Sequence, residues 1–501
     1  MESSAIGGGR LTRRAKLVCW CAIVLPVVLG LWMMVQHWVA VPYWDEWKTP
    51  GEQIASYYRG SLTWAELCSQ HNESRKLFPR LVYLPLAVIV GWDVRWVMAV
   101  SFAFVCGGSL LLYALARRTC ASPRAALFCY VSVNAWLFWP RQYENFLVGI
   151  QGELFVPAFA LAGACLVNLS RRPLWQKSLV NAVLAHVSTY SVANGMLIWL
   201  LAFPVRTLPA KTRGTRDGAW RVAYCAAAVA SVFCYFHGYE HAALSPQMVV
   251  TVGRWPELAH FLARWLGDIT LLPYPAIAGA AVLLLFVTFA MKAALLVRHT
   301  GEWQPHYPWI VLGVYTVISG CITAAGRLEF GLHAAAHFRY APFTAFLYIA
   351  VVGLIATTSS RLPIGALAKR ISLTTLAGLW CFALLQEQPH LDELTTHRSY
   401  VQRIVRWADA IPNNPQLASV SPYETTLATI RTLAAKDVLR PRLVSEILVQ
   451  PVKQPPLPRD DPAGVLEHVD ADLVAKGWAR IPDQQRPADC VLLGYEDTNA
   501  E

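Results

Sequence analysis

The sequence predicts an all-α polytopic membrane protein. About 11 transmembrane helices are expected, with further helices at the outer surface and a small extracytoplasmic α/β region at the C-terminus. Of the 501 residues, 55% are hydrophobic and only 15% are charged, whereas a soluble protein carries about a quarter charged residues. Several stretches approach the roughly 20 apolar residues that a helix needs to cross a bilayer. Lys and Arg gather at the ends of these stretches, as residues that set membrane orientation do.

The first predicted span, residues 17–40, follows a basic N-terminal region with Arg10, Arg13, Arg14 and Lys16. The apolar core of a signal peptide has about 7 to 15 residues, so this longer run predicts a retained signal anchor. Ten more apolar segments follow it, at 95–116, 125–139, 146–170, 178–193, 195–206, 220–237, 275–297, 308–325, 340–358 and 371–387.

Two further apolar stretches, 78–91 and 256–272, are short or interrupted. If either crossed the membrane, the basic loops that follow it would fall on the wrong side, so we expect both to form helices that lie at the outer surface or dip partway into the membrane. The segments 178–193 and 195–206 are also short, and Asn194-Gly195 between them is typical of a turn.

Orientation follows from the basic residues of the short loops. A cytoplasmic N-terminus puts nearly all of them on the cytoplasmic side: Arg117, Arg118, Arg124, Arg171, Arg172, Lys177, Arg206, Lys211, Arg213, Arg216, Arg221, Arg361, Lys369 and Arg370. The net charge of +11 is therefore spread over loop ends instead of forming one basic stripe. This pattern favours membrane topology and argues against a nucleic-acid partner.

The composition divides the chain into two regions. Residues 1–387 form the predicted transmembrane domain, in which 42–94 is the first extracytoplasmic loop. Residues 388–501 are polar and Pro-rich, and an odd number of spans puts them outside. Helical patterning over 391–449 and short strand-like segments between 473 and 493 predict a small mixed α/β domain.

An acidic pair, Asp45-Glu46, comes directly after the first span. Adjacent carboxylates at a membrane surface are costly to dehydrate, and the flanking Trp44 and Trp47 suit the headgroup region. The pair is therefore expected at the depth where the polar head of a lipid-borne substrate lies. Because neighbouring residues on a helix point about 100° apart, only one of the two would face a given site.

Other polar residues gather on the same predicted face, while the cytoplasmic loops hold mainly Lys and Arg. This set comprises His71, Glu73, Arg75, Arg141, Glu144, Asn194, His237, Glu240, His241, Arg327, His333, His337, Arg339 and Tyr340. Carboxylates, histidines and amides that converge on one face indicate a functional site.

Sugar transfer from a polyprenyl phosphate would use such a set. An acceptor hydroxyl that attacks the anomeric carbon needs a carboxylate base, and Asp45 or Glu46 can supply it. The lipid phosphate that leaves needs cationic partners, for which Arg75, Arg327 and Arg339 are candidates.

The order of several motifs resembles the GT-C membrane glycosyltransferases, and more narrowly a bacterial branch of them. The motifs, within residues 40–345, are Tyr43-Trp44-Asp45-Glu46-Trp47, His71-Asn72-Glu73-Ser74-Arg75, Gln142-Tyr143-Glu144-Asn145, Ser191-Val192-Ala193-Asn194-Gly195 and Arg339-Tyr340. The resemblance implies a bacterial inner-membrane enzyme with Asp45 as catalytic base and Glu46 as the second choice. It also implies a polyprenyl-phosphate sugar donor, a glycan or lipid acceptor and no certain cofactor, with a divalent metal left open. Ser74 departs from the motif, where a basic residue or histidine is expected.

Structural roles compete with several of these assignments. The acidic pair would also suit the start of a surface helix, Arg141 and Glu144 could form an ion pair, and Arg327 and Arg339 could reach lipid phosphates. His333 and His337 have metal-ligand spacing but no third ligand nearby in the sequence.

Two other functions remain alternatives. A transporter or flippase of a lipid-linked glycan would place ionisable residues near the bilayer midplane and often has inverted repeats, and neither feature is visible here. A glycan polymerase or ligase would use similar donors and outer-loop arginines. The early acidic pair favours simple transfer with inversion at the anomeric carbon.

Overall fold

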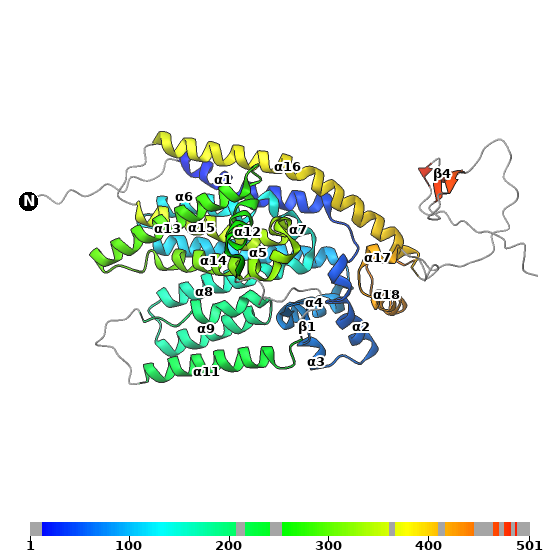
Figure 1. Cartoon of the computed structure of the whole chain (residues 1–501), viewed down its shortest axis with the longest axis horizontal. Helices are drawn as coiled ribbons and strands as arrows, with labels where there is room; N and C mark the ends of the chain where they lie inside the picture. Colours follow the sequence, from blue (N-terminus) through cyan, green and yellow to red (C-terminus); the bar gives the residue numbers. More distant parts are fainter. Residues whose placement is uncertain are drawn as a thin grey trace, which may run out of the picture.

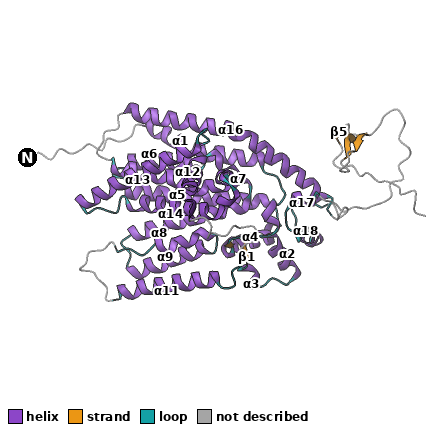
Figure 2. Cartoon of the chain, in the orientation of Figure 1, coloured by secondary structure: helices purple, strands orange, loops and turns teal. Residues whose placement is uncertain are grey.

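The computed structural model describes residues 13–206, 216–240, 253–359, 366–408 and 416–444, together with three strands within 464–487. Most of the described chain is helical (Figure 2). Some residues named above, including Lys211, Arg213, His241, Arg361 and the segment 491–493, lie outside the described residues.

Seven of the described helices are long and apolar enough to cross a membrane. They are α1 (Arg13–His37), α5 (Val94–Thr119), α8 (Val156–Leu169, with the preceding 3-10 turn η3, Gly149–Phe155), α11 (Asp217–Phe236), α13 (Pro275–Thr300), α14 (Tyr307–Arg327) and α15 (Ala341–Thr358). These helices confirm the prediction of an all-α membrane protein.

The other four predicted spans correspond to α6 (Pro123–Leu137), α9 (Leu174–Thr189), α10 (Leu197–Leu201) and part of α16 (Ala366–Arg406). With 5 residues, α10 is too short to cross a bilayer as a helix. The count of eleven spans therefore stays a prediction.

The helices lie side by side in a bundle. The elements of residues 42–93 lie at one end of this bundle (Figure 1). We call this the first-loop end.

The first loop is compact and mostly helical. It contains η1 (Trp44–Trp47), α2 (Gly51–Arg59), α3 (Trp64–Leu67), the two-stranded hairpin β1 (Gln70–His71) and β2 (Ser74–Arg75), and α4 (Leu77–Val90). The two apolar stretches predicted as surface helices are α4 and α12 (Trp255–Gly267). The buried side chain of Arg80 fastens α4 to the loop, because it donates to Thr49 Oγ1 at 3.0 Å and to Ser69 O at 2.7 Å.

The core of the bundle is built around α15. In its most apolar window 78% of the residues are buried, compared with 17% in α11 and in α13, so these two helices face outward. Small residues let α12 and α13 approach closely, since a Cβ at Gly279 would lie 1.8 Å from Ala263 O.

The C-terminal region does not begin at a helix end. Helix α16 runs without a break through residue 388, where the composition changes, and ends at Arg406. It is followed by α17 (Leu417–Val420) and α18 (Thr426–Ala435) and, further on, by an antiparallel sheet of β3 (Gly464–Val469), β4 (Ala475–Ile481) and β5 (Arg486–Pro487). One predicted strand, 477–479, lies within β4.

Replacing Gly279 with Ala tests the close approach of α12 and α13. We expect a loss of about 1 to 3 kcal/mol of stability, because the added methyl group must push two backbones apart. Thermal unfolding of the protein in detergent measures it. The control is Gly107→Ala in α5, where a Cβ meets nothing within 4 Å; equal unfolding temperatures for the two variants would contradict the packing argument.

Candidate functional site

The turn η1 directs the two carboxylates of the acidic pair differently. Trp44 has φ +52°, a left-handed conformation that is rare for a large side chain and marks local strain. The turn is closed by the backbone N–H of Tyr43, which donates to Glu46 Oε2 at 2.7 Å. Glu46 therefore folds back on the turn that presents Asp45.

Glu46 has a structural role in this arrangement. Its side chain is buried, and burial raises its pKa, while the charge of Arg398 and the N–H groups of Tyr43, Ile150 and Gly149 act in the opposite direction. A substrate hydroxyl in solvent cannot reach it. Of the two sequence candidates for the base, only Asp45 remains accessible.

Asp45 is 29% exposed and held by two side chains. Its Oδ1 accepts a hydrogen bond from the hydroxyl of Tyr423 at 2.7 Å, and its Oδ2 lies 3.6 Å from His71 Nε2. Burial acts to raise the pKa of Asp45, but His71, Tyr423 and the charge of Lys76 outweigh it and lower the pKa to about 2. Asp45 is therefore an oriented carboxylate that stays ionised at neutral pH.

The β1–β2 hairpin carries His71 and Glu73. Asn72 at its turn has φ +50°, which Asn tolerates better than most residues. Ser74, the departure from the expected motif, accepts a hydrogen bond from the backbone N–H of Ala193 at 3.1 Å. This bond brings the neighbouring Asn194, in η4 (Ala193–Met196), to the hairpin.

Arg75 fastens the same hairpin to the end of α11. Its guanidinium donates to the carbonyl oxygens of Tyr235 and His237, both at 2.7 Å, and to that of Cys68 at 3.1 Å. All three acceptors belong to the backbone. Arg75 is thus occupied within the protein, which argues against a role in binding phosphate.

On its other side the hairpin meets the loop between α14 and α15. Glu73 forms an ion pair with Arg327. Arg339, in the 3-10 turn η10 (Phe338–Tyr340), lies over the ring of Tyr340, with 5.4 Å from Cζ to the ring centre. The charges of Glu73 and Glu144 act on Arg339, but within the described residues no carboxylate approaches it to ion-pair distance.

His337 lies in the same loop. Its side chain is exposed, yet desolvation by the surrounding protein lowers its pKa to about 3, and the charges of Arg339, Arg141 and Arg327 add to the effect. We call the polar residues Asp45, His71, Glu73, Arg327, His337 and Arg339 the first-loop cluster.

Glu144 and Tyr340 act on Arg339 of this cluster, Glu144 through its charge and Tyr340 through its ring. Glu144, in α7 (Tyr143–Leu147), accepts a hydrogen bond from Gln151 Nε2 at 2.9 Å. Burial raises its pKa, and Gln151, Arg339 and Arg141 oppose that rise. The ring of Tyr340 lies 6.0 Å from those of Trp265 and His337.

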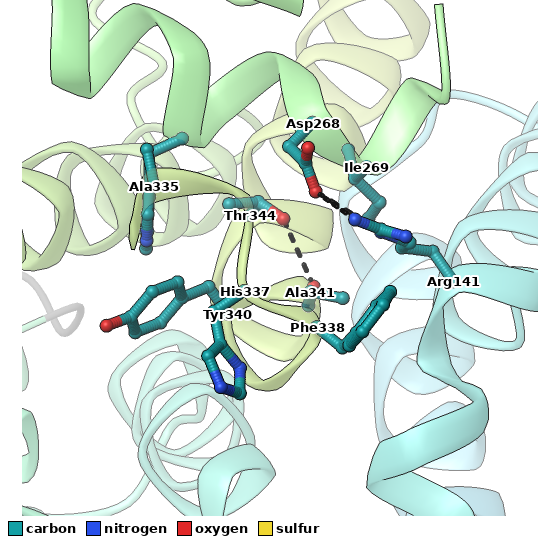
Figure 3. A pocket seen from close by; sticks show the side chains of 10 residues that line it. Arg141, Asp268, Ile269, Ala335, His337, Phe338, Tyr340, Ala341 and Thr344 are labelled. Atoms are coloured by element: carbon teal, nitrogen blue, oxygen red, sulfur yellow. Dashed lines mark hydrogen bonds and ion pairs between the residues drawn. The ribbon is translucent and has the colours of Figure 1, made fainter. Parts of the chain in front are cut away.

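Arg141 is held by two acidic partners. It lies 2.7 Å from Asp268, and its guanidinium stacks on Phe338 (Figure 3). Its second acidic partner, Glu387, lies 2.8 Å away. Side chains nearly fill the pocket around it, which leaves no room for a water-sized molecule. The predicted pairing of Arg141 with Glu144 is replaced by these two partners, and its role is structural.

Sequence reasoning missed three residues of this region. Tyr423 lies 378 residues from its partner Asp45. Lys76 lies 2.6 Å from Glu153, and Arg398 donates to backbone carbonyls of Val39, Val41 and Leu147. Of the three, only Lys76 could have been suspected from the sequence, because it directly follows the motif that begins at His71. No group of three possible metal ligands occurs among the described residues, His333 and His337 included.

Comparison of the chain with models of known families, with curated proteins and with solved structures returned no match. The resemblance to GT-C glycosyltransferases therefore stays a prediction from the motifs.

Replacing Arg398 with Met tests the structural role of Glu46. We expect a loss of about 3 to 5 kcal/mol of stability, because the change leaves a buried carboxylate without its cation and removes one hydrogen bond from each of three carbonyls. Thermal unfolding in detergent measures it. Arg403→Met, an exposed site on the same helix, is the control, and an equally small effect of both changes would contradict the assignment.

Proposed function

We propose that the protein is a membrane glycosyltransferase that moves a sugar from a polyprenyl-phosphate donor to a glycan or lipid acceptor, with inversion at the anomeric carbon. One observation carries the proposal. The β1–β2 hairpin joins an ionised, solvent-accessible carboxylate, Asp45, to a loop with the cation Arg339, which has no acidic partner at ion-pair distance among the described residues. A base and an anion-binding group are the two elements that this transfer requires.

Asp45 is suited to accept the proton of the attacking hydroxyl. In a single displacement the acceptor oxygen bonds to the anomeric carbon, the bond from that carbon to the phosphate oxygen breaks, and the hydroxyl proton passes to Asp45. A carboxylate with a pKa of about 2 is a weak base. Glycosyl transfer proceeds through an oxocarbenium-like transition state, in which the hydroxyl becomes acidic as its new bond forms. A weak, well-oriented base therefore suffices.

Arg339 is suited to bind the phosphate. Guanidinium groups recognise phosphate oxygens through paired hydrogen bonds. Arg75 and Arg141 are occupied by protein acceptors, and Arg327 is paired with Glu73. Of these four arginines, Arg339 has the charge that neighbouring protein groups neutralise least. The donor phosphate would supply the missing negative charge, and Arg327 would assist if its ion pair with Glu73 opened.

Replacing Asp45 with Asn tests the base. We expect transfer to fall by about 10²- to 10⁴-fold, the usual contribution of a positioned base, at unchanged protein level. Membranes are supplied in separate assays with undecaprenyl phosphate that carries radiolabelled glucose, mannose or arabinose, and label that leaves the donor is measured. Asp392→Asn, at a site 62% exposed on α16, is the control.

Two outcomes would overturn this assignment. Full transfer by Asp45→Asn would remove Asp45 as the base. If sealed vesicles instead take up the labelled donor with its sugar–phosphate bond intact, and no label reaches an acceptor, the protein is a transporter.

Replacing Arg339 with Gln tests the phosphate clamp. We expect undecaprenyl phosphate to bind about 10- to 100-fold more weakly, because a charge-assisted hydrogen bond is worth about 1.5 to 3 kcal/mol. Titration of the purified protein with undecaprenyl phosphate measures this. The control is Arg117→Gln, an exposed arginine at the opposite end of the bundle. Unchanged affinity in Arg339→Gln would show that the phosphate binds elsewhere.

A further inference from the structure

The C-terminal segment 416–444 is attached to the first loop at several points. Thr425 donates to Glu52, and Arg59 donates to Thr432 Oγ1 at 3.3 Å. Both contacts join α2 to the segment that contains α18, and the two helices lie close together at the first-loop end (Figure 1). This part of the C-terminal region therefore packs against the first loop.

A backbone connection fixes the far end of the same segment. The N–H of Trp92 donates to the carbonyl of Val438 at 2.8 Å, and Trp92 forms a parallel bridge with Leu439. Gly91, with φ +73°, permits the contact, because a Cβ there would lie 3.1 Å from Val438 O. Backbone hydrogen bonds do not depend on particular side chains, so they fix the position of the segment independently of Tyr423.

Tyr423 is the side chain that this attachment brings to Asp45. Its hydroxyl donates to Asp45 Oδ1, its ring centre lies 6.2 Å from that of His71, and Lys48 Nζ lies 5.7 Å from the ring centre. Burial and the neighbouring Asp45 carboxylate keep the hydroxyl protonated at neutral pH by raising its pKa. It can therefore act only as a donor to the carboxylate.

We propose that Tyr423 is a positioning residue for Asp45, so that the C-terminal segment is an integral part of the catalytic site; this inference rests on the proposed function. The hydroxyl holds Oδ1, while Oδ2, on the His71 side, stays available to the acceptor hydroxyl. Without Tyr423 the carboxylate can rotate about its Cβ–Cγ bond and lose its alignment. A misplacement of about 1 Å at a reacting group is enough to slow a reaction about 100-fold.

A double-mutant cycle in the full-length protein tests the proposal. Tyr423→Phe, Asp45→Asn and the combined variant are assayed with the labelled undecaprenyl-phosphate sugar that wild type uses. We expect Tyr423→Phe to lower kcat at least about tenfold with little change in KM for the donor. The combined variant should lose no more activity than Asp45→Asn alone, because Tyr423 acts through Asp45.

The pH dependence of kcat separates positioning from simple destabilisation. Asp45 is faced by His71, Lys76 and Tyr423, and loss of the Tyr423 hydroxyl removes one group that stabilises its ionised form. The pKa of Asp45 therefore rises, and the acid limb of the profile in Tyr423→Phe should move to higher pH. Destabilisation alone would leave the limb in place.

The matched control is Tyr400→Phe. Tyr400 lies on α16 and is 39% exposed. Additive losses in the cycle, or wild-type kcat and pH profile in Tyr423→Phe while Asp45→Asn is inactive, would overturn the positioning role and leave the proposed function intact. Full activity of Asp45→Asn would instead refute the proposed function.

Discussion

The arrangement at the first-loop end depends on the buried side chain of Arg398. From α16 it reaches the backbone carbonyls of Val39 and Val41, at 3.0 and 2.8 Å, and that of Leu147. These groups follow α1 and end α7, and the same charge stabilises the Glu46 carboxylate. A buried cation is costly unless hydrogen bonds compensate it, and Nη1 and Nη2 of Arg398 supply three such bonds, while its Nε has no partner among the described residues. One side chain thus sets the relative positions of three segments, and the strained turn at Trp44 lies among them.

The charged residues at this end divide according to their acceptors. Three arginines donate mainly to backbone carbonyls and so stabilise the fold: Arg75, Arg80 and Arg398. Arg141 serves the same purpose through its two carboxylates. Fewer charged residues are therefore available for catalysis or substrate binding than the number of polar residues on this face implies. A cluster of charges on one face is therefore a weak guide to function until the partner of each charge is known.

The sequence was a good guide to helices and a poor one to side-chain roles, for a physical reason. Apolar runs such as 95–116 and 340–358 predict helices because a bilayer admits few other structures, and α5 and α15 cover both. The sequence placed Glu73 and Arg327 on the same predicted face of the membrane, but it did not predict the ion pair between them. The choice between Asp45 and Glu46 depends on the dihedral angles of Trp44, and no periodicity encodes those. Tyr423 gave no signal, because its partner is 378 residues away and its region looked like a separate domain.

The position of Asp45 depends on two segments that lie far apart in the sequence. His71 and Tyr423 come from separate attachments, the hairpin and the C-terminal segment, and both converge on one carboxylate. Each attachment has a hydrogen bond of its own: the N–H of Ala193 donates to Ser74 Oγ, and the N–H of Trp92 donates to the carbonyl of Val438. The side chains that face Asp45 are thereby held on a rigid frame, as preorganised sites require. The same frame maintains the strained Trp44 turn, since a looser first loop would let the turn relax and change the orientation of Asp45.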